Sequence, residues 1–118
     1  MRRRVDPKAA LSHETALDIY DVSDLIPDRY HVTVPQARRI RRADNAAYVV
    51  HEGVLAPGQV TWWEQMRVVT LAAAIEQCLG FGTPAYLLRQ AIGRGAAKGW
   101  LRHADRARLA ERMERERG

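Results

Sequence analysis

The sequence has few of the features that would place it in a specialised class of protein. A single cysteine, Cys78, excludes an internal disulfide framework and a cysteine-based zinc site. The longest apolar run, residues 68–75, is interrupted by Thr70 and falls well short of the roughly 20 residues of a membrane-spanning helix. No apolar stretch follows the arginines at positions 2–4, so the amino terminus does not resemble a signal peptide. These absences predict a cytoplasmic protein without a membrane association.

Lysine is also scarce, because 17 of the 19 basic residues are arginine, and the formal net charge is +5. Residues 1–42 hold nine basic and six acidic residues, residues 43–91 two and four, and residues 92–118 eight and four. Basic ends around a mildly acidic centre suit an anionic partner, either nucleic acid or an acidic protein. The alternative, equally compatible with the charge alone, is that the excess only keeps a small protein soluble.

A chain of 118 residues fits one domain with one modest core. We expect residues 1–10 to form a flexible basic arm and residues 11–118 a single domain. Alternating β-branched and aromatic residues predict short strands over 30–34, 46–51, 59–63 and 67–69. Apolar residues at helical spacing predict helices over 13–20, 70–79, 84–98 and 104–116. The predicted class is α+β: a small mixed or antiparallel sheet of three to four strands, helices on one face and a helical C-terminal half.

Hydroxyl side chains mark the predicted starts of the helices, and glycines mark two of their predicted ends, at Gly80 and Gly82 and at Gly99. Ser12, Thr70 and Thr83 are expected at N-cap positions, with Pro84 as the first helical residue after Thr83. The Gly-Arg-Gly stretch over 93–95 resembles a phosphate-binding loop, but it lies inside a strong helical pattern. We therefore expect it to allow close packing between helices.

Recognisable catalytic and metal-binding motifs are missing from the sequence. There is no Walker loop, GxGxxG, GxSxG, HExxH or CxxC pattern. The histidines, His13, His31, His51 and His103, include no pair three or four residues apart, and we expect surface positions or hydrogen-bonded core positions for them. Ser12 and His13 are neighbours that cannot by themselves form a nucleophile–base pair across a cleft. The sequence thus predicts no catalytic residue, metal site or cofactor, and leaves open an enzyme whose site no motif marks.

Two sets of basic residues are candidates for contacts with another macromolecule. The first is Arg38, Arg39, Arg41 and Arg42, whose guanidinium groups must face solvent or a partner. The second lies on the last two predicted helices and comprises Arg89, Arg94, Lys98, Arg102, Arg106 and Arg108. Both sets can bind phosphate groups through sequence-independent contacts, and both can equally be solvated surfaces.

Trp62 and Trp63 are adjacent on a predicted strand, so their side chains should point to opposite faces of the sheet. One tryptophan is then in the core. The other is either an exposed interface anchor or, as we expect, covered by the C-terminal helix.

The order of several short segments resembles a known family. The segment LSHETAL over 11–17 resembles the SHxSAL opening of the antitoxin domain of AbiEi-type proteins, which belong to type IV toxin–antitoxin systems. The strand IPDRYHVTVP over 26–35, the arginine-rich segment over 38–42 and the strand YVVH over 48–51 follow in the family order. The segments over 68–80 and 83–101 are similar to the family's later strand and helices, so the resemblance spans residues 11–112.

The resemblance implies an antitoxin that neutralises a cognate nucleotidyltransferase-type toxin and contributes to autoregulation of its operon, in part through the operator DNA backbone. It marks Ser12, His13, Ala16 and Leu17 as the family signature. The residues expected to contact toxin or nucleic acid are Arg38, Arg39, Arg41, Arg42, Arg89, Arg94, Lys98 and Arg102. The alternative from the residues alone is a nucleic-acid-binding transcriptional regulator that acts through its arginine-rich surfaces.

The chain departs from the family at two places. Typical members carry a winged-helix domain before the Ser-His opening, where this chain has about ten residues, so we expect an isolated antitoxin domain, a truncated piece or a short variant. The usual Thr-x-x-Arg-Thr segment is replaced by residues 70–75, which contain no arginine. Any role of that arginine is therefore absent from this segment.

Overall fold

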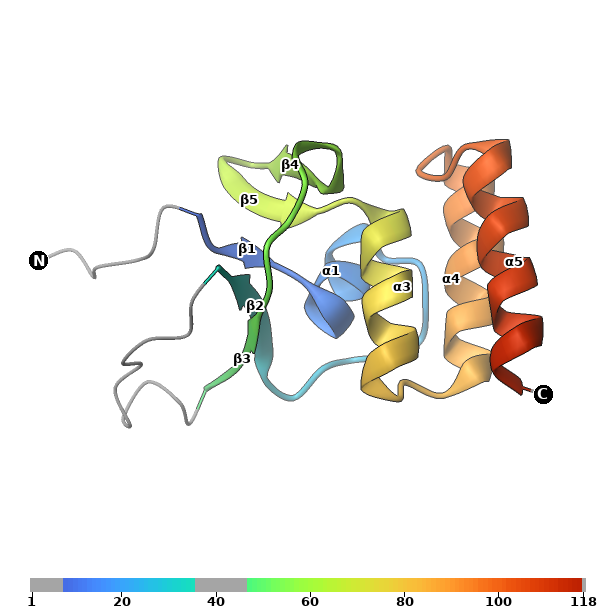
Figure 1. The fold of residues 1–118 in the computed structure, drawn as a ribbon, viewed down its shortest axis with the longest axis horizontal. Coiled ribbons are helices and arrows are strands. Elements are labelled where there is room, and N and C mark those ends of the chain that lie inside the picture. The colour runs from blue at the N-terminus through green and yellow to red at the C-terminus, as the bar shows by residue number, and fades with distance from the viewer. Residues whose placement is uncertain (1–7, 36–46, 118) are drawn as a thin grey trace, which may run out of the picture.

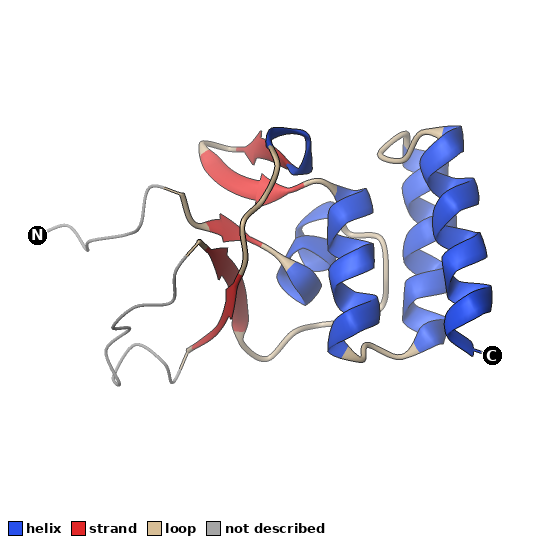
Figure 2. Cartoon of the chain, viewed as in Figure 1, coloured by secondary structure: helices blue, strands red, loops and turns tan. Residues whose placement is uncertain are grey.

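The computed structural model describes residues 8–35 and 47–117. The strands are β1 (Ala10–Leu11), β2 (Tyr30–Val34), β3 (Tyr48–Glu52), β4 (Val60–Trp63) and β5 (Met66–Val69). The helices are α1 (His13–Tyr20), α3 (Leu71–Phe81), α4 (Ala85–Lys98) and α5 (His103–Arg117), with a short 3-10 helix, η1 (Pro57–Gln59). The predicted α+β class is confirmed, including the helical C-terminal half (Figure 2).

The described strands form one mixed sheet with the order β3-β2-β1-β5-β4. In it, β2 and β3 run parallel, with Tyr30 opposite Tyr48 and Thr33 opposite His51. The β4–β5 hairpin is antiparallel, whereas β1 runs antiparallel to β2 and parallel to β5. The two-residue strand β1 is therefore the element that joins the two pairs into a single sheet.

This central strand is a correction to the sequence-based prediction, which expected three to four strands and a flexible arm over 1–10. Ala10 is buried and pairs with Thr33, and Leu11 pairs with both Val32 and Val68. Two residues are too few to show an alternating pattern, so only their pairing in the folded sheet identifies the strand. Residues 1–7 of the predicted arm lie outside the described residues.

The helices lie on one side of the sheet in two layers, with α1 and α3 next to the strands and α4 and α5 beyond them (Figure 1). Large side chains that are fully buried form the core between these layers: Leu17, Leu71, Ile75, Leu88 and Leu109. Burial of each such side chain stabilises the fold by roughly 1.5–3 kcal/mol. None of the described helices has the length and apolar character needed to cross a membrane.

Two of the predicted helix caps are confirmed by the structure. The Thr70 hydroxyl accepts a hydrogen bond from the Ala73 backbone N–H, and this satisfies a free donor in the first turn of α3. Gly99 ends α4 with a φ of 87°, a left-handed conformation that glycine adopts without steric cost.

The other two predicted caps differ in their hydrogen bonds. Ser12 is the N-cap residue of α1, as predicted, but its hydroxyl makes no capping hydrogen bond. Thr83 donates its hydroxyl proton to Glu14 instead, and Pro84 takes the N-cap position of α4. In both cases a buried side-chain partner from a distant segment competes successfully with the local backbone N–H groups.

Candidate functional site

A buried polar cluster lies where α1 and α3 meet β2 and β3. We call it the histidine cluster and define it as Ser12, His13, Glu14, His31, Thr33, His51 and Thr83. Three of its residues come from the junction of β1 and α1, three from adjacent positions on β2 and β3, and Thr83 from the turn before α4. The chain segments are far apart in sequence, so only the fold brings these side chains together.

Ser12 is at the centre of the hydrogen bonds on the α1 side. The Thr33 hydroxyl donates to Ser12 Oγ at 2.7 Å, and Ser12 Oγ lies 2.8 Å from His13 Nδ1. Because Ser12 already accepts from Thr33, its own proton is available for an unprotonated His13 Nδ1. This arrangement requires a neutral His13 ring whose proton sits on Nε2.

The three histidine rings of the cluster are stacked nearly parallel. The ring centroids of His13 and His51 are 3.5 Å apart with an interplanar angle of 10°, and those of His31 and His51 are 5.2 Å apart at 16°. Phe81, in the last turn of α3, contacts all three rings with its edge. The stack thereby connects α1, β2, β3 and α3 through side chains.

A second chain of polar contacts runs from Glu14 to His51. Glu14 Oε1 lies 3.8 Å from His31 Nε2, and His31 Nδ1 lies 2.9 Å from His51 Nε2. The nearby carboxylate favours a proton on His31 Nε2, which leaves Nδ1 to accept the proton of His51 Nε2. His51 is the most solvent-accessible of the three rings, and its Nδ1 then has no proton.

Burial lowers the pKa of every histidine in this cluster. The pKa of His13 falls to about 3, mainly through desolvation and then through the charges that His51 and His31 would carry. Desolvation also lowers the pKa of His51, with a smaller contribution from His31. For His31, desolvation lowers the pKa and outweighs the opposing effect of Glu14. The cluster is therefore built for uncharged imidazoles.

His13 also has a strained backbone, since its φ of 54° lies in the left-handed region that non-glycine residues rarely adopt. The His13 backbone N–H donates to Gln77 Oε1 of α3 at 3.1 Å. Residues held in such conformations cost on the order of 1–3 kcal/mol and gather at functional sites. This observation marks the histidine cluster, rather than a basic surface, as the most specialised part of the described chain.

Access limits what the cluster can do chemically in this conformation. A serine hydroxyl bonded to an imidazole is the arrangement of an activated nucleophile, but Ser12 is 0% exposed. Within residues 8–35 and 47–117, no group of three or more histidine, cysteine or acidic side chains could hold a metal ion. In the same residues every buried polar side-chain atom has a hydrogen-bond partner. As it stands, the cluster is a closed and fully satisfied network.

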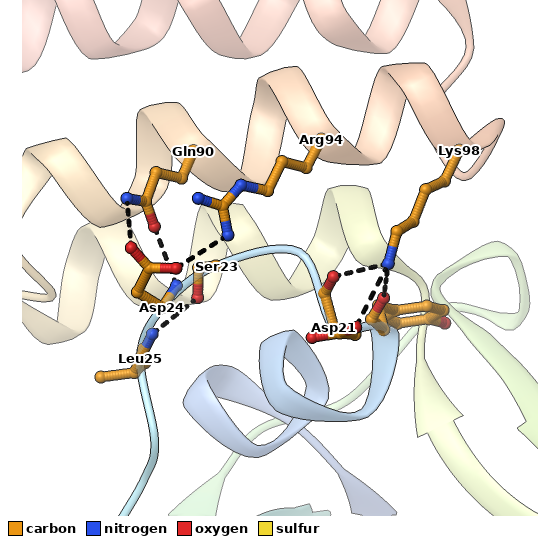
Figure 3. A network of polar contacts seen from close by, with 8 residues as sticks. Asp21, Ser23, Asp24, Leu25, Gln90, Arg94 and Lys98 are labelled. Carbon is orange, nitrogen blue, oxygen red and sulfur yellow. Dashed lines mark hydrogen bonds and ion pairs between the residues drawn. The ribbon is translucent and has the colours of Figure 1, made fainter.

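The basic residues predicted on α4 are largely occupied by contacts within the protein (Figure 3). Arg94 forms an ion pair with Asp24 at 3.0 Å, and Gln90 hydrogen bonds to the same carboxylate. Lys98 Nζ donates to the backbone carbonyl of Asp21 at 2.7 Å, at the carboxyl end of α1. A cation at this position satisfies free carbonyls and the negative end of the helix dipole. These two side chains fasten the loop after α1 to α4.

The basic residues of the α4–α5 turn and of α5 are partly neutralised in the same way. Arg102 lies 3.7 Å from Asp105, and Arg108 pairs with both Asp105 and Glu76. These four side chains line a cleft of about 360 Å³ together with Trp100, Gln59 and the first turn of α3. The two arginines and two carboxylates leave the cleft without an excess of either charge.

The remaining predicted contact residues divide into two groups. Arg89 is exposed on α4 and has no ion-pair partner among the described residues. Arg38, Arg39, Arg41 and Arg42 lie outside the described residues. Of the predicted basic residues that the structure describes, none is brought together with the histidine cluster.

The two tryptophans of β4 have different surroundings, as expected for neighbours on a strand. Trp63 is half-buried and packs against Tyr20 and Trp100, with ring centroids 5.4 Å away in both cases. Trp62 is 67% exposed. The expectation that the C-terminal helix covers the outer tryptophan is thus wrong. The rings of Tyr20 and Trp100 pack against Trp63 instead.

The family-signature residues are placed at the cluster and in the core beneath it. Ser12 and His13 belong to the histidine cluster, whereas Ala16 and Leu17 are fully buried on the next turn of α1. Sequence reasoning missed the meeting of His13 with His31 and His51 because these residues are 18 and 38 positions away from His13. A usable signal was present in β2, where buried His31 and Thr33 alternate with valines that the hydrophobic pattern would place inside.

Comparison of the sequence with protein families and curated proteins identifies no relative. No protein-family model and no curated protein sequence matches the chain. The functional conclusions below therefore depend on the residues, their geometry and the resemblance of the ordered motifs.

Proposed function

We propose that this chain is an antitoxin domain that neutralises a nucleotidyltransferase-type toxin by binding it. The observation that carries the proposal is the meeting of three motif segments in one place. The Ser-His opening, the HVTV strand and the YVVH strand supply Ser12 and His13, His31 and Thr33, and His51 to a single cluster of hydrogen-bonded and stacked side chains. Short motifs that match by chance have no reason to converge in this way, so the convergence supports their origin as parts of one domain.

Trp62 is the best candidate for the centre of the toxin-binding surface. It projects from β4, which is at the edge of the sheet and pairs only with β5 among the described strands. Exposed tryptophans are enriched among the residues that dominate the energetics of protein interfaces. Met66, at the start of β5, is a further exposed apolar side chain of this hairpin, but it is paired with Trp63 and so lies on the other face of the sheet from Trp62.

The ion pairs of the helical layer favour a protein partner over nucleic acid. Arg94, Lys98 and Arg102, which were expected to contact phosphate groups, already face Asp24, Asp21 and Asp105. Binding of DNA through these residues would first have to break contacts within the protein. The alternative of a nucleic-acid-binding regulator thus depends mainly on the arginines over 38–42.

Co-expression provides the test of this proposal. The chain is produced together with the nucleotidyltransferase encoded beside it, and we expect growth to be restored and the two proteins to co-purify. Trp62→Ala should weaken the complex by at least tenfold, because truncation of a central interface tryptophan costs on the order of 2 kcal/mol or more. Tyr86→Ala is the matched control, since Tyr86 is also an exposed aromatic residue but lies on α4.

Three outcomes would contradict the proposal. Absence of rescue by the wild-type chain would remove the antitoxin function. Rescue accompanied by a mass change of the toxin in the presence of ATP would indicate a phosphotransferase. Tight, salt-sensitive DNA binding that is lost in an Arg38, Arg39, Arg41 and Arg42 to alanine variant, without binding to the toxin, would indicate the regulator.

A further inference from the structure

The histidine cluster is the feature of the described chain that proton uptake changes most. Its three imidazoles come from α1, β2 and β3, and the hydrogen bonds allow His13 and His31 only one proton each. A second proton on His13 Nδ1 would remove the acceptor of the Ser12 hydroxyl. A second proton on His31 Nδ1 would bring two N–H groups face to face in the contact with His51.

We propose that the histidine cluster is an acid-sensitive latch that holds β2 and β3 against α1 and α3, and that protonation of His51 opens it. This inference does not depend on the proposed antitoxin function.

His51 is the entry point for the proton because of its place in the network. Its Nε2 proton is committed to His31, which leaves Nδ1 as the basic atom of the most accessible ring. The resulting imidazolium would stack on the His13 ring, whose centroid is only 3.5 Å away, inside a layer shielded by Phe81. Among residues 8–35 and 47–117, no carboxylate is seen to stabilise this positive charge, since Glu14 faces His31 rather than His51.

The other titratable groups around the cluster leave this conclusion unchanged. Glu14 on α1 is held by the Thr83 hydroxyl at 2.7 Å and acts on His31. Asp28 and Arg29, which precede β2, act on His31 with opposite signs. On α3 the nearest titratable group is the Cys78 thiol, whose pKa burial raises to about 12, so it stays uncharged across the relevant range.

The position of β3 determines which element is released. It is an edge strand, and its only pairing within the described sheet is to β2. His51 is the side chain through which β3 enters the cluster. Loss of that contact leaves β3 held by its backbone pairing with β2 and by the contacts of Tyr48 with Tyr30 and Arg29 at its first residue. The core of Leu71, Leu88 and Leu109 lies on the far side of α3 and does not contact the rings, so the helical layer should stay folded.

Hydrogen exchange measured by mass spectrometry on the intact chain tests this proposal. After correction for the intrinsic effect of pH on exchange, the amides of β3 should exchange up to about thirtyfold faster at pH 5.0 than at pH 7.0. This is the upper limit for one histidine with an ordinary pKa in the open state and a lowered pKa in the closed state. The amides of α4 should stay more protected than those of β3 at both pH values.

Variants assign the effect to His51. His51→Gln should abolish most of the acceleration, and His51→Phe, which keeps an aromatic ring in the stack, serves if the glutamine variant does not fold. His103→Gln is the matched control, because His103 is exposed at the start of α5 and should leave the acceleration intact. Equal exchange of β3 at both pH values in the wild-type chain, protection in α4 that falls to the level of β3 at pH 5.0, or full acceleration in a folded His51 variant would each overturn the proposal.

Discussion

Left-handed backbone conformations of single residues have two different causes in this protein. At His13 a left-handed residue is held by a partner on another helix, because its backbone N–H donates to Gln77. At Asp21 the same conformation, with a φ of 55°, simply ends α1. The first is enforced by tertiary contacts and the second by local structure, so only the second could be expected from the sequence.

The turn between β4 and β5 contains two more left-handed residues, Glu64 and Gln65, with φ values of 48° and 70°. A two-residue hairpin turn of this kind prefers asparagine followed by glycine. Gln65→Gly should therefore raise the free energy of unfolding by about 0.5–1 kcal/mol, because it removes the steric cost of a side chain at positive φ. Urea denaturation followed by tryptophan fluorescence measures this change.

Gln65→Ala is the matched control for that substitution. It shortens the side chain but keeps a β-carbon at positive φ, so it should not stabilise the protein. Equal stability of the glycine and alanine variants would show that the backbone of this turn carries no strain.

Among the elements, α4 shows most directly how neighbouring glycines can have opposite roles. A β-carbon at position 95 would lie 2.4 Å from Leu71 Cδ2 and 3.4 Å from Leu101 Cδ1, both in the core, whereas one at position 93 would meet no atom within 4 Å. Close packing at this Gly-Arg-Gly stretch was predicted from the sequence and is confirmed, at Gly95 alone. The absence of a side chain lets α4 approach the first turn of α3.

Gly95→Ala should lower the free energy of unfolding by about 1–3 kcal/mol, because the buried Leu71 side chain must move to admit the methyl group. Gly93→Ala on the same helix is the control and should raise it by up to about 1 kcal/mol through better helix propensity. Thermal and urea denaturation of the two variants give the comparison. A stabilised Gly95→Ala variant would contradict the close approach of α3 and α4.

The elements that could be predicted from the sequence are those with local signals. The helix over 71–81 has a threonine cap and a glycine end, and the strand over 30–34 has β-branched alternation. β1 had no such signal, because its two residues are defined only by partners on β2 and β5. Which residues of β2 are buried could not be predicted for a related reason. The polar residues His31 and Thr33 are buried because hydrogen-bond partners from other segments lie beside them.

At the scale of the whole molecule, the positive charge of the helical half is less available, among the described residues, than the sequence indicates. Arginines and Lys98 of the helical half pair with carboxylates of the loop after α1 and of α3, so that elements distant in sequence are connected. These pairs are mostly exposed, and exposed ion pairs contribute little to stability. Their main consequence is to reduce the basic surface, which is a whole-molecule property that no single motif reveals.

The free energy of unfolding of the whole protein should fall in mild acid, because burial lowers the pKa of the histidines in the cluster. The pKa of His13 is about 3 in the folded protein and about 6.5 when it is unfolded, so the unfolded chain binds more protons below pH 6.5. The contribution of His13 is complete above pH 6.5 and is lost as the pH falls toward 3. At pH 5.0 the loss amounts to up to about 2 kcal/mol relative to pH 7.0.

Urea denaturation at the two pH values, followed by the fluorescence of Trp63 and Trp100, measures this loss because both residues report on packing remote from the rings. The difference should persist at high salt, since its main cause is desolvation rather than long-range charge. His103→Gln should show the same loss as the wild-type chain. Unchanged or greater stability at pH 5.0 would mean that His13 is accessible to protons in the folded protein, and the closed network described above would then be wrong.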